Sequence, residues 1–337
     1  NVKTPGFSRL QTITGSLAGQ GGLSVGGGVE VISIRRMTNE FHNQQLWRAT
    51  TEQNFYSASQ QYLTALEALM SGTGSSISAG LDQFFAALSE ASATPGSIAL
   101  RQQIIGEAGN LAQRFNGLSS NIDAQVKALQ EQRTAMATEI NGLTENIALL
   151  NKKIVETESV KGDSTALRDQ RESLIGQLTQ FAKLRINETP DGSVSVALAN
   201  GQPLVAGATA GQLKVAMTAS GEQEVSLAFA GTSFPLRQDG FGGAFGGLHD
   251  VEYGSLRPNL EALHDMASQL AQMVNDVLAT GFDLNGNPGQ PLFAYDPTST
   301  TALLRVEPLT AEQLALSSAA GETGNNEVRS EERRVGK

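Results

Sequence analysis

The chain has 337 residues, of which 39% are hydrophobic and only 5% aromatic, and this length suffices for two domains. Lys and Arg number 24 against 34 Asp and Glu; the resulting net charge of −10 argues against a nucleic-acid-binding protein, which needs a basic face to neutralise phosphates. The absence of Cys excludes a disulfide scaffold and a Cys-ligated metal site, and no uncharged apolar run reaches the roughly 20 residues of a membrane span, so no membrane insertion is predicted.

Both ends of the chain have features of a truncated sequence. The first residues lack Met and carry the turn signal Thr4-Pro5-Gly6, and because a domain seldom begins on a turn we expect further residues before Asn1. Residues 329–337 are rich in Arg and resemble the translation of a sequencing-library adapter. We expect them to be a non-native tail, with a basic tail for an acidic partner as the alternative.

Residues 1–33 have an extended, loop-rich pattern, whereas residues 38–161 have the apolar spacing of long helices. Over 97–161 the spacing alternates between four and three, which is typical of a coiled-coil seam, with an interruption at Arg133. A helix of that reach is about 90 Å long, since each residue adds about 1.5 Å. The sequence therefore predicts a rod. The seam begins with Ile104, Ala108, Leu111, Phe115, Leu118 and Ile122.

A returning helix is predicted over 164–185, with Asp163 or Ser164 as its N-cap and Leu184 as its last apolar residue. Over 186–256 the apolar period shortens to two and hairpin turns recur, which predicts an inserted antiparallel β domain. Helical spacing returns over 257–328, where a last short helix is expected from Thr310. The predicted fold class is α+β: an elongated α-helical rod domain formed by 1–185 and 257–328, with the small β domain inserted.

Two short patterns resemble chemical sites. Residues 22–26 match G-x-S-x-G around Ser24, but a nucleophile elbow needs a strand before the Ser and a helix after it, and glycines surround this one. Asp283 and Asn285 resemble the start of a calcium loop, whose sixth and twelfth positions require Gly and Glu; this chain has Pro288 and Ala294 there. A turn is the better interpretation of the second pattern.

The remaining candidates for chemistry are few. The chain has three His, at 42, 249 and 264, without the spacing of metal ligands. The charged segment 169–172 is interpreted as a helical face that is solvated or that bridges to a neighbouring helix. We therefore predict no catalytic residue, no cofactor and no metal.

Five segments, in the right order, carry a resemblance to a known family. Residues 1–9 resemble the N-T-P-G-Y-S-R segment of bacterial flagellar axial proteins, and residues 26–36 resemble the stretch that follows it in the flagellar hook-associated protein 1 family. Residues 167–174 are similar to that family's L-x-D-Q-R-D-x-L. Residues 191–207 resemble its first β hairpin and residues 280–287 its post-helix loop. The motif positions singled out are Thr4, Pro5, Gly6, Phe7, Arg9, Asp169, Gln170, Arg171, Asp283 and Asn285.

The resemblance implies a non-enzymatic structural subunit that joins hook to filament and is exported by the flagellar type III apparatus to an extracellular position. Its implied partners are copies of itself in a ring, the hook protein, the second hook–filament junction protein and an export chaperone. In the family, terminal helices absent from this chain pair with each other and carry polymerisation, so the resemblance implies an internal fragment.

Other functions remain open at this point. The chain could be another flagellar axial protein, either the second junction protein or the hook protein. It could also be an exported adhesin or glycan-binding protein that uses the β insert, where Phe241, Phe245 and Tyr253 form the only aromatic cluster. A hydrolase using Ser24 is the third alternative.

Overall fold

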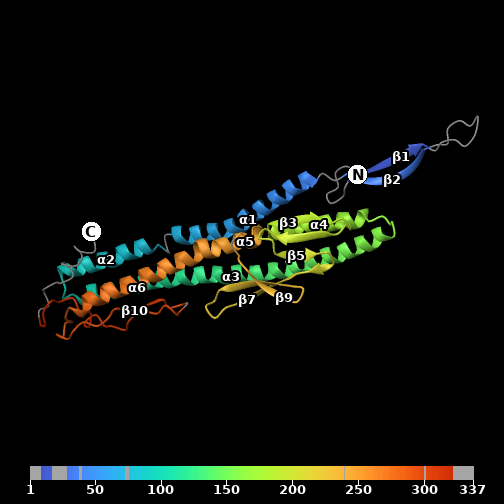
Figure 1. Ribbon diagram of the computed structural model, residues 1–337. Helices are drawn as coiled ribbons and strands as arrows, with labels where there is room; N and C mark the ends of the chain where they lie inside the picture. The colour runs from blue at the N-terminus through green and yellow to red at the C-terminus, as the bar shows by residue number, and fades with distance from the viewer. Residues whose placement is uncertain are drawn as a thin grey trace, which may run out of the picture. The chain divides into compact units, whose positions relative to one another are not determined.

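The computed structural model describes residues 9–16, 29–37, 40–72, 76–238, 240–299 and 301–321. Long helices combine with short antiparallel strands (Figure 1), which confirms the α+β class. The Thr4-Pro5-Gly6 turn, Phe7, Ser24 and the tail at 329–337 lie outside the described residues. The elements are β1 Arg9–Ser16, β2 Val29–Met37, α1 Glu40–Ser71, α2 Ile77–Ala93, α3 Ile98–Ser159, α4 Thr165–Phe181, β3 Leu184–Glu188, β4 Val194–Leu198, β5 Pro203–Ala206, β6 Thr209–Ala210, β7 Gln212–Met217, β8 Gln223–Phe229, β9 Thr232–Leu236, α5 Gly243–Val251, the π-helix η1 Glu252–Leu256, α6 Arg257–Ala279, β10 Phe293–Tyr295 and β11 Leu304–Val306.

The chain divides into two compact units, and each unit is built from separated stretches. Unit 1 comprises the residues up to Gln60 together with Gln130–Asp250, and unit 2 comprises Gln61–Leu129 together with the residues from Val251 onward. The division into a helical domain and an insert over 186–256 stays a prediction. None of the described helices has the length and hydropathy required to cross a membrane.

Unit 1 contains two antiparallel sheets, with strand orders β3-β4-β5-β6 and β7-β8-β9. Val194, Val196 and Leu198 of β4 are buried while the residues between them are partly exposed, which confirms the period of two. The sheets share a core with the C-terminal part of α3, with α4 and with α5. Its fully buried members include Ile140, Ile147, Leu178, Val196, Leu204, Leu227 and Phe245.

The predicted boundaries of unit 1 are wrong at two helix ends. Helix α4 ends at Phe181, and Leu184 begins strand β3 instead of closing the helix. Helix α5 begins at Gly243, although the sequence pattern predicted β structure up to residue 256. Its glycines lower the local helix propensity, but burial of Phe245 and Leu248 overrides that preference.

The interruption of the apolar seam at Arg133 does not interrupt α3, which is continuous. The Arg133 side chain is fully buried, and it donates hydrogen bonds to the side-chain oxygens of Gln223 at 2.9 Å and Gln238 at 3.0 Å. A buried cation needs such acceptors because it has lost its hydration. The polar residue in the pattern therefore marks a specific polar contact in unit 1.

Unit 2 contains α2, the N-terminal part of α3, α6 and the hairpin of β10 and β11. The predicted seam residues from Ile104 to Ile122 are buried, and the rings of Phe84 and Phe293 meet edge to face with centroids 5.8 Å apart. The short helix expected from Thr310 is wrong, because a turn occupies that position.

Candidate functional site

The Asp-Gln-Arg segment on α4 holds three backbone segments together through Arg171. Its buried guanidinium donates to the side-chain oxygen of Asn151 and to the carbonyl of Gly192, each at 2.8 Å. The fully buried Asn151 of α3 accepts a hydrogen bond from the N–H of Val194 and donates to the carbonyls of Val194 and Gly207. This network joins α3, α4 and the β3–β4 turn, so the motif has a fastening role within unit 1.

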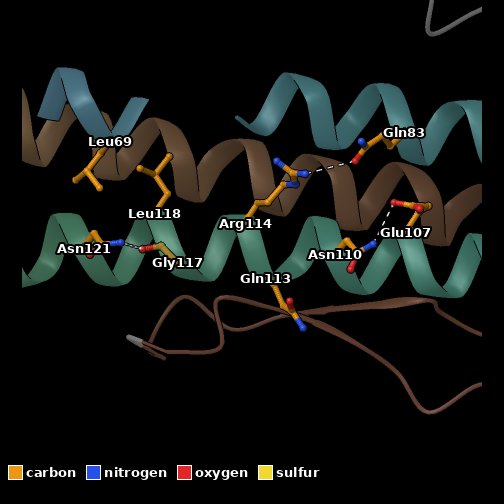
Figure 2. Close-up of a pocket in the computed structure, with 9 residues that line it drawn as sticks. All are labelled: Leu69, Gln83, Glu107, Asn110, Gln113, Arg114, Gly117, Leu118 and Asn121. Atoms are coloured by element: carbon orange, nitrogen blue, oxygen red, sulfur yellow. Dashed lines mark hydrogen bonds between the residues drawn. The ribbon is translucent and has the colours of Figure 1, made fainter. Parts of the chain in front are cut away.

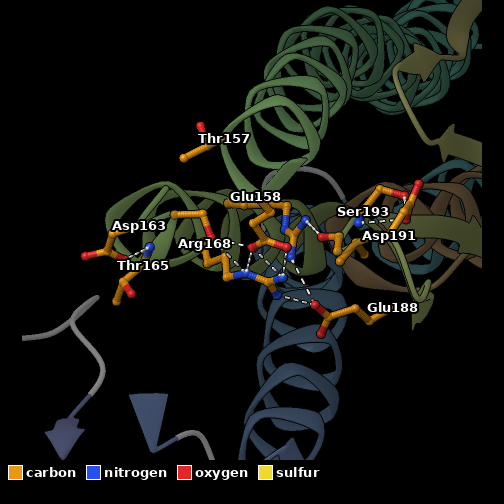
Figure 3. Close-up of polar contacts among 12 residues, drawn as sticks. Thr157, Glu158, Asp163, Thr165, Arg168, Glu188, Asp191 and Ser193 are labelled. Carbon is orange, nitrogen blue, oxygen red and sulfur yellow. Dashed lines mark hydrogen bonds and ion pairs between the residues drawn. The ribbon is translucent and has the colours of Figure 1, made fainter. Parts of the chain in front are cut away.

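Arg168, one helical turn before Arg171, lies between two carboxylates (Figure 3). It donates to Glu158 at 2.8 and 3.0 Å and also to Glu188 of β3. Burial favours the neutral form of Glu158, but hydrogen bonds from Ser164 and Arg168 outweigh it, so the pKa of Glu158 lies below its ordinary value. The pair closes the reversal between α3 and α4.

The other two motif residues have different surroundings: Asp169 is buried, and Gln170 is exposed on α4. Sequence reasoning missed Arg168, Asn151 and Glu158, which the structure brings to the same site. No local spacing could have linked Asn151 to α4, because the contact arises only when the chain reverses after α3. The i, i+3 placement of Arg168 and Arg171 on one helix face was the available signal.

The loop after α6 forms the expected turn around Asp283. The buried Asp283 carboxylate accepts hydrogen bonds from the N–H groups of Asn285 at 2.8 Å and Asn287 at 2.7 Å, and from the Asn287 side chain at 3.0 Å. Burial opposes ionisation, but these donors outweigh it and hold the pKa of Asp283 below its usual value. Both carboxylate oxygens are therefore engaged within the loop, while the Asn285 side chain is exposed.

Within the described ranges, no group of three or more His, Cys, Asp or Glu side chains is arranged to hold a metal ion. His42 lies on α1, His249 in the last turn of α5 and His264 on α6. Of the N-terminal motif only Arg9 is described; it is the first residue of β1 and pairs with Met37 of β2.

The aromatic cluster proposed for glycan binding is not a surface feature. Phe241 and Phe245 are 4% and 0% exposed, and their rings pack 4.6 Å apart in the core of unit 1. Tyr253 belongs to unit 2, where the Arg257 guanidinium lies 5.2 Å from its ring centroid. Phe241 and Phe245 are therefore too buried to stack on a sugar, and of the three only the partly exposed Tyr253 keeps accessible aromatic surface.

Unit 2 has a shallow hollow of about 580 Å³ over α3 (Figure 2). Leu69 of α1 and Gln83 of α2 contribute to its wall. Two pairs of its polar side chains bind each other: Arg114 donates to Gln83 at 3.4 Å, and Asn110 donates to Glu107 at 3.2 Å. These groups do not converge on a common point, so the hollow has no arrangement for catalysis.

Comparison with known proteins gives a consistent result. The model of the family described as "Flagellar hook-associated protein FlgK helical domain" matches residues 63–293. "Flagellar hook-associated protein 1" of Escherichia coli is 27% identical over 299 residues, covering 86% of this chain and 54% of that protein. Its counterpart in Salmonella typhimurium is 26% identical over 303 residues, covering 87% and 55%.

A solved structure, that of the flagellar hook junction protein FlgK from Burkholderia pseudomallei, has a TM-score of 0.67 and 26% identity. The match covers 77% of this chain and 47% of that one. The chain spans about half the length of the curated relatives it matches.

Proposed function

Because the chain belongs to the flagellar hook-associated protein FlgK family, we propose that it is a structural subunit of the bacterial flagellum that joins the hook to the filament. The observation that carries this proposal is the family match over residues 63–293, about two thirds of the chain. The solved junction protein supports it, since the same fold extends over 77% of the chain.

The polar contacts of the described residues fit a structural role. Arg171, Asn151 and Asp283 all bind backbone groups and so stabilise particular chain reversals. A subunit of a mechanical assembly needs such fixed geometry, whereas a catalytic group needs access to substrate. We infer a non-enzymatic protein with no cofactor.

The proposal includes location and partners. The protein would leave the cell through the flagellar type III export apparatus and form a ring of copies between the hook protein and the second hook–filament junction protein, with an export chaperone as its partner before secretion. The collinear motifs at 167–174 and 280–287 favour the first junction protein over its axial neighbours.

A chimaera tests this proposal. The matching segment of the Escherichia coli relative, 299 aligned residues, is replaced by that of this chain in a strain lacking the native gene. We expect the chimaera to appear in the culture medium and to restore filaments and swimming. The control is a strain whose native segment is reinserted by the same route.

The adaptor role would be contradicted if the chimaera folds and is exported but the hooks still carry no filaments. Retention of the folded chimaera in the cytoplasm would contradict the export component of the proposal. The adhesin alternative is not favoured, because two of the three aromatic side chains it would use, Phe241 and Phe245, are buried.

A further inference from the structure

Strand β3 has an open edge in unit 1. It is the first strand of its sheet and pairs only with β4 among the described strands. On β4, Val194 and Val196 direct their backbone groups away from β3, toward Asn151 and β5 respectively. In an antiparallel pair, two residues that face each other direct their backbone N–H and C=O groups either both toward the partner strand or both away from it. Glu188 is paired with Val194 and Ile186 with Val196, so the backbone groups of Glu188 and Ile186 point away from β4, toward the open edge. Those of Leu184, two residues before Ile186, point the same way.

At two comparable positions in unit 1, an Asn side chain forms hydrogen bonds with the backbone N–H and C=O groups that point away from the neighbouring strand. Asn151 binds both backbone groups of Val194, and Asn141 binds both of Leu213 at the outer edge of β7, at 2.7 and 2.9 Å. No described side chain forms such hydrogen bonds with the outward backbone groups of Leu184, Ile186 or Glu188. An unpaired row of donors and acceptors on a strand edge is a template for another strand.

The open edge forms one wall of a groove of about 500 Å³. Residues 183–187 line that wall, and the facing wall is helix α1, which contributes the partly buried Trp47 and Phe55 and the exposed Tyr56. A smaller hollow of about 110 Å³ shares Trp47 and continues to Arg171. The groove therefore offers a strand edge on one side and aromatic surface on the other, all within unit 1.

The charges of the groove are opposite to those of the chain. Arg48, Lys183 and Arg185 are exposed on its rim, and Glu52 is the acidic residue that lines the same hollow. The three cations have no ion-pair partner in the described part of the chain. In a protein of net charge −10 this local excess of positive charge selects for acidic ligands.

We propose that this groove binds an extended acidic segment of a partner protein, which adds as a strand to the outer edge of β3. Five residues of β3 give the added strand about 17 Å of pairing length. Backbone pairing provides affinity, acidic side chains meet Arg48 and Arg185, and an apolar side chain packs on Trp47. This binding property concerns unit 1 alone and does not require the chain to belong to a flagellum.

A displayed library of random capped heptapeptides, selected against the full 337-residue chain, tests the proposal. We expect enrichment of acidic, β-prone sequences whose binding changes the fluorescence of Trp47, the single Trp of the chain. The double variant Arg48→Glu/Arg185→Glu should weaken binding about ten-fold or more. The matched control is Lys153→Glu/Lys214→Glu, which makes the same charge change at exposed positions outside the groove.

Backbone hydrogen exchange distinguishes strand addition from binding by side chains alone. In the unbound protein the amides of Leu184, Ile186 and Glu188 should exchange faster than those of Arg185 and Asn187, which are bonded to β4. Bound peptide should protect the three faster amides. N-methylation of the peptide at the residues facing β3 should abolish binding, and at the alternate residues should leave it unchanged.

Three results would overturn the proposal. In the first, the selection enriches no peptide. In the second, the enriched peptides bind the Arg48→Glu/Arg185→Glu variant as tightly as the control variant. In the third, a bound peptide leaves the amides of Leu184, Ile186 and Glu188 unprotected from exchange. Any of these can occur whether or not the chimaera restores filaments, so this inference and the flagellar role fail separately.

Discussion

The Arg171 network and the Asp283 loop are both built around a charged side chain that binds backbone groups, but they differ in the range of their contacts. Arg171 reaches partners 20 and 21 positions away, and Asn151 continues the network to residues 43 and 56 positions further on. Asp283 binds only groups within four positions of itself. One site fixes how distant segments meet; the other fixes the path of a single loop.

This difference predicts how much of the structure a substitution destabilises. Loss of a side chain with long-range hydrogen bonds leaves buried polar groups without partners on several elements at once, so the whole unit loses stability. Loss of a side chain with only local hydrogen bonds makes the loop more mobile but leaves the neighbouring helix folded. Substitutions at matched positions can test this contrast.

Arg171→Ala should have the largest effect, a loss of about 3 kcal/mol in the free energy of unfolding of unit 1, because the buried Gly192 carbonyl and the Asn151 side chain each lose a charged donor. Urea unfolding followed by Trp47 fluorescence measures it. Gln170→Ala, at an exposed position of the same helix, is the control. Equal stability of the two variants would show that the network contributes nothing.

Gly192→Ala should come next, at about 2 kcal/mol, because the residue has φ +84° and an added Cβ would displace the ion pair of Glu158 and Arg168, lying 2.5 Å from the Glu158 carboxylate and 2.7 Å from the Arg168 guanidinium. Gly286, in the Asp283 loop, has a similar φ of +77° but no atom closer than 3.8 Å, so Gly286→Ala should cost only about 1 kcal/mol. Chemical unfolding monitored by circular dichroism compares them. A larger loss for Gly286→Ala would reverse the contrast.

Asp283→Ala should cost about 1 kcal/mol and act locally, since three hydrogen bonds within one loop are lost. Hydrogen exchange measured on peptides should show faster exchange over 283–289 with unchanged protection in α6. Asn285→Ala, which keeps the backbone donor, is the control. Faster hydrogen exchange throughout α6 would show instead that the Asp283 loop stabilises the whole unit.

The smallest expected effect is on the stability of unit 1 at low pH. The pKa of Glu158 is below its ordinary value of 4.5, so its contribution to stability is fully present above that value and is lost as the pH falls through the lowered pKa. Because a third of the side chain is exposed, we expect less than about 1 kcal/mol. Glu158→Gln should reduce the fall in stability of unit 1 between about pH 7 and about pH 3.

Urea midpoints at the two pH values measure this effect, with the exposed Glu156→Gln as control. If Glu158→Gln leaves the acid sensitivity unchanged, the ion pair with Arg168 does not contribute to it.

Much of the architecture could be predicted because periodicity is a local property. The seam from Ile104 to Ile122, the alternation in β4 and the Asp283 turn each follow from residues a few positions apart. The predictions were wrong where burial by distant segments overrides local preference, as in the glycine-rich helix α5. They were also wrong where a helix and a strand join without a turn signal, as at Leu184.

By itself, the sequence determined the apolar spacing of the long helices and of β4, the absence of Cys chemistry and the family resemblance that the comparisons confirmed. Tertiary structure decided which residues meet: that Asn151 joins Arg171, that Phe241 and Phe245 are buried, and that the outer edge of β3 stays open beside Trp47. The reason is physical. Hydrophobic spacing specifies which face of an element is buried, but partners across the fold are specified only when the elements pack and each buried polar group must find a hydrogen bond.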